Sequence, residues 1–311
     1  MKVVIFGGAG MLGSAICEEV LSHGHSVVTA GRSGCDVRVD FRYAHSAEEF
    51  APIIEGADVV INAVGILIER GDERFDAVHV AAPQALFEAC ATAHVARVVQ
   101  ISALGAGRAK PISGRYMASK RDAEAALMKA MASSRGDAVI VRPGLLMDAA
   151  SPATKLFMQL ACLPMIALPG LVSGLFRSGS ARLAPMLCSD AAAAICRICE
   201  HPKALHRAIE IAGPEELSYR DFLVQLRSAQ GLKAAIWLPM PWALMRLAGK
   251  LAEFSPQKVI SENGMRVLQV GITTERNESL YWLRCMPKPA VAGVFIAQSA
   301  IKSVVSKKAS A

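Results

Sequence analysis

The chain opens with KVVIFGGAGMLG at residues 2–13, an apolar run followed by glycines at positions 7, 8, 10 and 13. Glycines between a strand and a helix are the setting in which a backbone loop binds phosphate. Gly7 and Gly10 allow a tight turn and a close approach to a pyrophosphate, and Gly13 lets the helix pack closely on the strand. The helix start then directs unpaired N–H groups at the ligand. A tight turn without a ligand is the alternative, but the register favours cofactor binding. The cofactor-binding residues expected in this loop are Gly7, Gly10, Met11, Leu12 and Gly13.

Apolar, β-rich runs alternate with helical patterns over the first half of the chain. Strands are expected at residues 2–6, 26–30, 37–39, 58–63, 97–101 and 138–141. Helices are expected at residues 11–22, 47–54, 75–94 and 114–133. This alternation is typical of βαβ units, in which helices cover both faces of a parallel sheet. With right-handed crossovers it predicts an α/β fold for residues 1–150, a doubly wound parallel sheet of the Rossmann type.

The pattern changes after residue 150, and we expect a smaller, mostly helical substrate lobe over residues 151–302. Part of this lobe should return to the sheet through a helix at 189–200 and a strand at 208–211. A further helix should begin after Ser218, which is a good N-cap residue. Only residues 303–311 have the composition of a disordered tail.

Residues 156–176 contain no charged residue and would be long enough to span a membrane. Prolines and glycines within this stretch argue against a continuous helix. We therefore expect a hydrophobic substrate cleft, or a segment that lies on a membrane surface. Two other apolar patches could contact lipid or a partner: the helix at 243–254, which follows Trp237 and Trp242, and residues 290–301. Ordinary packing of the 243–254 helix on its own domain is the alternative.

Charge is distributed unevenly between the two halves. Residues 1–150 carry 15 Lys and Arg against 17 Asp and Glu, whereas residues 151–311 carry 19 against 10. A basic, apolar second half suits an anionic ligand or an anionic membrane surface, and a plain basic surface is the alternative. No basic cluster with interleaved aromatic residues is present, so we expect no nucleic-acid partner.

The second strand ends in Gly31-Arg32-Ser33, where an acidic residue would bind the free ribose of NAD. A guanidinium at this position can pair with a ribose 2′-phosphate and stack on adenine, which favours NADP over NAD. Asp40, after the third strand, could accept a hydrogen bond from the adenine amino group. A strand-end turn residue is the alternative interpretation of Asp40.

Tyr116 and Lys120, in the sequence YMASK, are four residues apart and share one face if the segment is helical. A lysine ammonium beside a phenol favours the phenolate, which lowers the pKa of tyrosine toward the range of a general acid or base. This spacing also arises by chance on exposed helices. The preceding glycine loop and Ser102 give it its functional context.

Taken in order, these motifs resemble those of extended or atypical short-chain dehydrogenase/reductases. The resemblance rests on GGAGMLG at 7–13, Asp40, Asn62-Ala-Val-Gly65, Ser102, YMASK at 116–120 and Arg142-Pro143-Gly144. It implies that Tyr116 donates or accepts the proton, that Lys120 binds the ribose hydroxyls and lowers the pKa of Tyr116, and that Ser102 orients a substrate carbonyl. The further cofactor contacts that it implies are Ala63, Val64, Gly65, Lys120 and Pro143.

Within this family, the segments at 62–69, 75–80 and 101–105 are similar to the branch that contains the NADPH-binding accessory subunit of respiratory complex I. That resemblance implies a structural role in which the nucleotide is not turned over. His79 stands where extended members usually place an asparagine that holds a water in a proton relay. An imidazole can relay a proton, and a packed core histidine is the alternative.

The eight cysteines lie mostly in apolar runs, as expected of free thiols in a reducing compartment. The CxxC pair, Cys196 and Cys199, has no second pair or histidine set near it in the sequence, so we expect no metal site. The residues before Gly7 leave no room for a signal peptide. We expect a cytoplasmic protein, with peripheral attachment to the inner face of a membrane as an additional hypothesis.

Together these features favour an NADP(H)-dependent oxidoreductase that acts on the carbonyl or alcohol of a small apolar substrate. An epimerase of nucleotide sugars uses the same residues, but the apolar second half argues against a polar sugar. The competing hypothesis is an NADPH-binding scaffold or assembly protein that docks to a membrane complex. A nucleotide-dependent sensor that binds without reaction is a third hypothesis.

Overall fold

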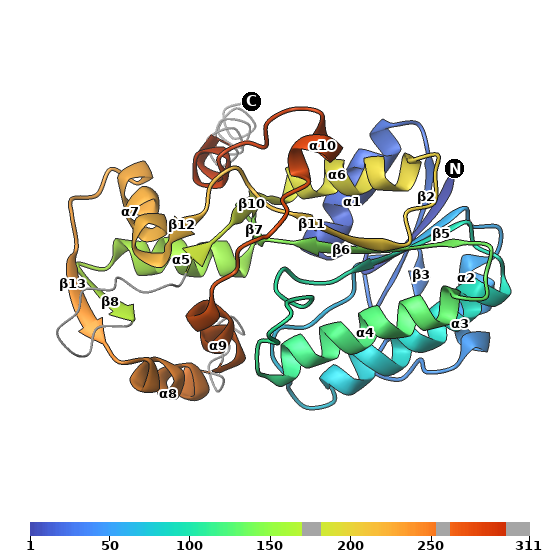
Figure 1. Cartoon of the computed structure of the whole chain (residues 1–311), viewed down its shortest axis with the longest axis horizontal. Helices are drawn as coiled ribbons and strands as arrows, with labels where there is room; N and C mark the ends of the chain where they lie inside the picture. Colours follow the sequence, from blue (N-terminus) through green and yellow to red (C-terminus); the bar gives the residue numbers. More distant parts are fainter. Residues whose placement is uncertain (170–181, 253–261, 297–311) are drawn as a thin grey trace, which may run out of the picture.

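The expected sheet is present as seven parallel strands in the order β11-β6-β5-β4-β1-β2-β3 (Figure 1). The strands are β1 (Lys2–Phe6), β2 (Ser26–Gly31), β3 (Val37–Arg38), β4 (Val59–Asn62), β5 (Arg97–Ile101), β6 (Asp137–Pro143) and β11 (Arg207–Ile211). The computed structural model describes residues 1–169, 182–252 and 262–296. Strand order reverses between β1 and β4, and in such sheets ligands bind outside the carboxyl ends of the strands at that point. The doubly wound fold is therefore confirmed.

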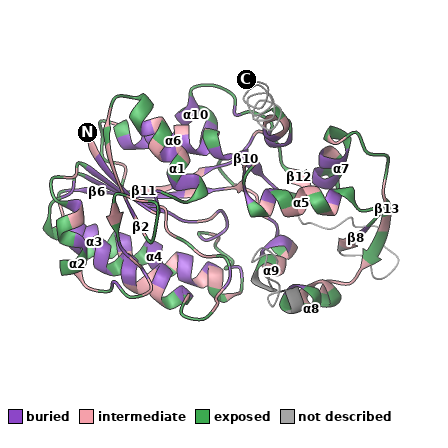
Figure 2. Ribbon diagram, turned by 180° about the vertical axis from the view of Figure 1, so that it is seen from behind, coloured by how far each residue is buried: buried purple, intermediate pink, exposed green. Residues whose placement is uncertain are grey.

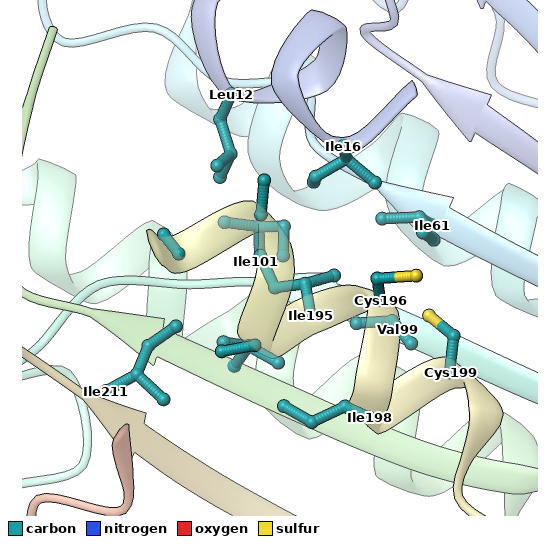
Figure 3. Packing of buried hydrophobic residues seen from close by; sticks show 14 of the residues in the cluster. Leu12, Ile16, Ile61, Val99, Ile101, Ile195, Cys196, Ile198, Cys199 and Ile211 are labelled. Atoms are coloured by element: carbon teal, nitrogen blue, oxygen red, sulfur yellow. The ribbon is translucent and has the colours of Figure 1, made fainter. Parts of the chain in front are cut away.

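Two layers of helices cover the sheet. One face is covered by α1 (Met11–Ser22), α6 (Cys188–Glu200) and α10 (Ser279–Leu283), and the other by α2 (Ala47–Ile54), α3 (Ala82–Thr92) and α4 (Arg115–Met131). On the first face, leucine, isoleucine and valine side chains of α1 and isoleucine, alanine and cysteine side chains of α6 pack against the central strands (Figure 3). Figure 2 shows this burial as a continuous central layer with exposed outer helix faces.

The predicted helix at 75–94 is divided into two parts. A π-helical segment, η1 (Asp76–Ala81), leads directly into α3. Pro83 lies in the first turn of α3 and has no N–H group to donate to the His79 carbonyl, so the regular α-helical pattern cannot run through this point. Such π turns are frequent at functional sites, and this one places His79 beside the site described below.

The remaining elements build the lobe beyond the sheet. They are β7 (Leu145–Met147), α5 (Pro152–Cys162), β8 (Met165–Pro169), β9 (Arg182–Leu183), β10 (Pro185–Leu187), β12 (Leu217–Ser218), α7 (Tyr219–Ala229), β13 (Ile236–Met240), α8 (Trp242–Ala252) and α9 (Glu262–Val270). Ser218 caps α7 as expected, its hydroxyl accepting from the Asp221 N–H at 3.0 Å. A core around Phe222 and Leu223 holds the lobe together.

The apolar stretch at 156–176 does not form one helix where the structure describes it. It begins inside α5, which ends at Cys162, and continues into β8; its residues 170–176 lie outside the described part. None of the helices in the described ranges has the length and hydropathy that a membrane crossing requires.

The other two apolar patches differ in exposure. On α8, Leu244 and Leu247 are exposed, whereas Trp242 packs partly against the lobe core. In the helix at 290–296, Ala290, Val291 and Val294 are buried. Residues 297–301 and the tail at 303–311 lie outside the described part of the chain.

A substitution at Gly13 tests the close packing of α1 on β1. A Cβ at Gly13 would lie 2.1 Å from the Gly7 carbonyl oxygen, whereas one at Gly10 would lie 3.1 Å from the same atom. We expect Gly13→Ala to lower the free energy of unfolding by about 3 kcal/mol or more, and Gly10→Ala to lower it by about 1 kcal/mol. Urea unfolding of the two variants measures this difference. Equal losses would contradict the packing described here.

Candidate functional site

The glycine loop forms a cradle at the carboxyl end of β1. Gly7 has a φ of +83°, a conformation that side chains rarely adopt, and its carbonyl oxygen accepts from the Gly10 N–H at 2.9 Å. Gly10 is the N-cap of α1, and the first turn of that helix contains no acidic residue. The helix start thus has a positive end and N–H groups that no cap side chain satisfies. These features fit the pyrophosphate of a dinucleotide.

A cleft runs from this loop across the carboxyl ends of β2, β3 and β4. It brings together most of the expected cofactor residues: Gly7, Gly10, Arg32, Asp40, Ala63, Val64 and Gly65. The other expected residues lie elsewhere. Met11 is 36% exposed at the start of α1, while Leu12 is buried in the core beneath the loop. Pro143 ends β6, where its carbonyl oxygen accepts from the Leu104 N–H.

Two ion pairs line the cleft where β2 and β3 end. Arg32 Nη1 lies 2.6 Å from Glu73 Oε1, and the Arg32 side chain remains 54% exposed. Asp40 is bound by Arg42, whose Nε donates to both carboxylate oxygens at 3.0 Å. These hydrogen bonds hold the pKa of Asp40 below its usual value. Asp40 therefore stays ionised, with part of its acceptor capacity already occupied by Arg42.

Tyr116 and Lys120 lie on α4 as expected, with Lys120 directly beneath the cleft. A Cβ added to Gly65, which lines the cleft, would lie 3.3 Å from Lys120 Nζ. The Lys120 ammonium also donates to the Ile101 carbonyl oxygen at 3.2 Å. Burial lowers the pKa of Lys120 to about 8, with the Glu124 charge acting in the opposite direction.

The expected lowering of the Tyr116 pKa is wrong for the protein without ligand. Burial raises the pKa of Tyr116 to about 12. The Tyr116 ring lies beside two other rings. The ring centroids of Phe75 and His79 are each 5.9 Å from that of Tyr116. It also packs with the apolar cluster that contains Met117 and Val267. The phenol is therefore protonated at neutral pH.

Ser102 is placed differently from the expectation. Its hydroxyl donates to Glu124 Oε1 at 2.5 Å, and the side chain is buried. The Glu124 carboxylate is also bound by Arg142, whose Nε and Nη2 donate at 2.9 and 2.6 Å. Side chains alternate in direction along an extended segment, and the next residue, Ala103, belongs to the cluster that packs with Tyr116. In the structure the Ser102 hydroxyl is thus a hydrogen-bond partner of the buried Glu124–Arg142 ion pair.

His79 is a packed and hydrogen-bonded core residue. Its Nε2 accepts from the Ile66 N–H at 3.0 Å, which assigns the proton to Nδ1. Nδ1 lies 2.9 Å from Ser119 Oγ, and that hydroxyl donates to the Tyr116 carbonyl oxygen. Burial, together with the Lys120 charge, holds the pKa of His79 well below its usual range. A neutral imidazole thus connects Ile66, which lines the cleft, to Ser119 of α4 through two hydrogen bonds.

A comparison with protein families identifies the chain. The sequence model of the NAD dependent epimerase/dehydratase family matches residues 3–212. The chain belongs to this family.

Solved structures show the same fold at low sequence identity. A structure titled MoeE5 in complex with UDP-glucose and NAD is 16% identical, with a TM-score of 0.71 over 97% of this chain and 100% of that chain. The UDP-glucuronic acid 4-epimerase from Bacillus cereus, in complex with UDP-glucuronic acid and NAD, is 16% identical, with a TM-score of 0.68 over 98% and 100%. A short-chain dehydrogenase/reductase superfamily protein from Agrobacterium tumefaciens with bound NAD is 15% identical, with a TM-score of 0.70 over the whole of both chains. The narrower resemblance to the complex I branch stays a prediction.

For this member of the epimerase/dehydratase family, sequence reasoning missed several residues of the site. Glu124 could have been recognised, because it lies four residues after Lys120 and so continues the same face of α4. Arg42 lies two residues after Asp40, a spacing that suits local pairing. Glu73 carries no comparable signal. It reaches Arg32 from a loop 41 residues away in the chain.

The buried ammonium of Lys120 makes stability depend on pH in the ligand-free protein. Its pKa falls from 10.5 to about 8 on folding, so the unfolded chain binds more protons between these values. Stability should therefore rise with pH from about 8 to 10 through this group. Burial raises the pKa of the Cys90, Cys188, Cys196 and Cys199 thiols above 9.0, which opposes this rise from about pH 9, and the raised pKa of Tyr116 opposes it above about pH 10. Lys120→Met should lose the rise that comes from Lys120, seen in urea unfolding as a difference in stability from the wild type that changes between about pH 8 and 10.

Lys129→Met is the matched control, because Lys129 is exposed on the same helix. It should keep the rise. An identical pH dependence of stability in wild type and Lys120→Met would contradict the buried ammonium.

Proposed function

We propose that the protein is an NADP(H)-dependent oxidoreductase that acts on a carbonyl or alcohol group of a small apolar molecule. One observation carries the proposal: Lys120 lies directly beneath Gly65 of the dinucleotide cleft, on the same helix face as a protonated Tyr116. Family membership supports a nicotinamide cofactor. The catalytic pair is then Tyr116 and Lys120.

The protein residues divide the work of proton transfer between them. When bound, the nicotinamide ring supplies or accepts a hydride. Tyr116, protonated because of its burial, gives its proton to the substrate oxygen in the direction of reduction. Lys120, fixed by the Ile101 carbonyl, binds the ribose hydroxyls and stabilises the phenolate that remains.

Ser102 acts as a positioning residue in this proposal. Its hydroxyl completes the hydrogen bonding of Glu124, which also pairs with Arg142. Glu124 lies one helical turn from Lys120, and its charge favours the ammonium form of that residue. The buried ion pair thereby helps to keep the lysine charged in a site that otherwise favours its neutral form.

The apolar substrate class rests on the residues around Tyr116. Tyr116 packs against an apolar cluster that includes Met117 and Val267, and Val267 comes from α9 of the second lobe. A hydrocarbon skeleton would lose little by entering such surroundings, whereas sugar hydroxyls would need hydrogen-bond partners there. The solved neighbours whose titles name nucleotide sugars support epimerisation of such a sugar as the alternative.

For the cofactor we propose NADP, with NAD as the alternative. Arg32 lines the cleft after β2, and its half-exposed guanidinium can reach a 2′-phosphate while Glu73 holds one of its nitrogens. The titles of the neighbouring structures name NAD. Relative affinity for the two cofactors therefore decides this point.

A non-catalytic, NADPH-binding scaffold that docks to a membrane complex is the second candidate. It is favoured by the hydrogen bonds that already occupy both His79 nitrogens and the Ser102 hydroxyl. The exposed Leu244 and Leu247 of α8 offer an apolar surface for docking. In that case the bound cofactor would stabilise the fold by mass action alone.

Two substitutions distinguish the proton transfer by Tyr116 from the positioning role of Ser102. Tyr116→Phe removes the proton that the reaction needs, and we expect at least a hundredfold loss of turnover with cofactor affinity nearly unchanged. Ser102→Ala should lower the free energy of unfolding by about 1–3 kcal/mol, because it leaves a buried carboxylate with one partner fewer. It should retain most of the turnover. The assay follows absorbance of the reduced cofactor with a panel of quinones and ketones.

A tightly held cofactor without turnover on any member of the panel, together with co-sedimentation with membranes, would favour the scaffold. Equal loss of turnover in both variants would return Ser102 to a direct catalytic role. Epimerisation of a nucleotide sugar, detected from its products because the cofactor is regenerated, would overturn both the substrate class and the net oxidoreduction.

Arg32→Ala tests the cofactor preference. Charge-assisted hydrogen bonds contribute about 1.5–3 kcal/mol, so we expect NADP affinity to fall about tenfold or more and NAD affinity to change little. Titration calorimetry with both cofactors measures this. Arg38→Ala, at an exposed position that ends β3, is the control. Equal losses for NADP and NAD in Arg32→Ala would reject the 2′-phosphate contact.

A further inference from the structure

Two helices on one face of the sheet run side by side and bring metal-binding side chains together at their ends. At their starts, Cys188 Sγ of α6 lies 3.5 Å from the Met11 carbonyl oxygen of α1. At their ends, Glu200 of α6 hydrogen-bonds His23, the C-cap residue of α1. Since α1 has 12 residues, these ends lie about 18 Å along the helix from the glycine loop. The cluster is therefore separate from the cofactor cleft.

Four side chains of types that bind zinc meet at this point. His23 Nδ1 lies 2.8 Å and His25 Nε2 lies 2.9 Å from the same oxygen, Glu200 Oε1. The ligand atoms of His23, Cys196 and Glu200 all lie within 4.8 Å of one another, the only such group within the described residues. Ligand atoms around a tetrahedral zinc ion, with bonds of about 2.0–2.3 Å, are about 3.3–3.8 Å apart. His25 is not a member of that group, so its ring would have to turn toward the ion to become a fourth ligand.

The surroundings of the cluster resemble the support that metal ligands receive. Glu19 Oε1 lies 3.4 Å from His23 Nε2, the nitrogen that faces away from Glu200. Nδ1 donates its proton to Glu200 here, and with a metal in place of that proton the Glu19 carboxylate could orient the ring through Nε2. The end of α6 is itself held, because Arg97 Nη1 donates to the Ile198 and Cys199 carbonyl oxygens at 2.6 and 2.9 Å.

We propose that His23, His25, Cys196 and Glu200 form a structural Zn²⁺ site that joins the end of α1 to α6. Four protein ligands close the site to substrate, which is the arrangement of structural zinc. Cys196 is fully buried on the core side of α6, near Cys199 (Figure 3). The metal would displace the thiol proton, at a cost that its binding energy offsets. Sequence spacing does not indicate this site, because His23 and Cys196 are separated by more than half of the chain.

The chemistry distinguishes this site from an ordinary hydrogen-bonded cluster. Two imidazoles that share one carboxylate also form a stable surface contact without metal, and that contact would not involve Cys196. A thiolate ligand is therefore the decisive feature. Co²⁺ reports it directly, since cobalt bound to a thiolate shows a sulfur-to-metal charge-transfer band in the near ultraviolet and intense visible bands when tetrahedral.

The full chain, freed of metal with a chelator, would be titrated with Co²⁺ under reducing conditions and then with Zn²⁺. We expect one ion per chain, a charge-transfer band that Zn²⁺ abolishes, and a higher Tm with Zn²⁺ present. Cys196→Ser should lose the band. Cys199→Ser, one turn further along the same helix, is the matched control and should keep it.

Variants of the more exposed residues guard against misfolding as an explanation. His23→Gln should weaken Zn²⁺ binding, and Glu19→Gln should weaken it about 10–100-fold through the orientation of His23. Absence of the band in wild type would overturn the proposal. So would equal loss of the band in both cysteine variants, or Zn²⁺ affinity that His23→Gln and Glu200→Gln leave unchanged. None of these readouts depends on enzymatic activity.

Discussion

The close contact between Gly13 and Gly7 is the constraint on which the rest of the structure depends. It lets α1 lie against β1 with its positive end at the carboxyl edge of the sheet, where the strand order reverses. The dinucleotide cleft is built around that edge, and α6 packs against α1 on the same face. A side chain at Gly13 would separate helix from strand and move both the phosphate cradle and the far end of α1.

A row of buried and partly buried charges on the other face of the sheet supports the proposed reaction site. The charge of Glu124 acts on Lys120, and the Glu124 carboxylate pairs with Arg142. Arg142 also lies 3.8 Å from Glu210 of β11. Buried charges are stable only when paired and hydrogen-bonded. The lysine beneath the cleft is thus one end of a network that connects α4 to the strand that returns late in the chain. This explains why β11, far from the motifs in sequence, matters for the site.

The sequence predicted the strands and most helices of the sheet domain and the glycine loop, because these depend on local periodicity or on a backbone that only glycine adopts. It also placed Tyr116 and Lys120 on one helix face. It did not predict the short strands of the lobe, nor the π-helical break within the helix at 75–94. It could not predict that the Ser102 hydroxyl donates to Glu124, because that contact depends on the direction of one side chain beyond the end of β5. The role of His79 depended on partners at Ile66 and Ser119, which only the tertiary structure supplies.

The central claim is that Tyr116 and Lys120, beneath the dinucleotide cleft, form a site that reacts. Reduced NADP deuterated at C4 of the nicotinamide, incubated with the protein and a panel of apolar ketones, tests it by mass spectrometry of the products. The account predicts one deuterium per alcohol formed with wild type and essentially none with Tyr116→Phe. A cofactor that binds tightly while no deuterium reaches any product would contradict it.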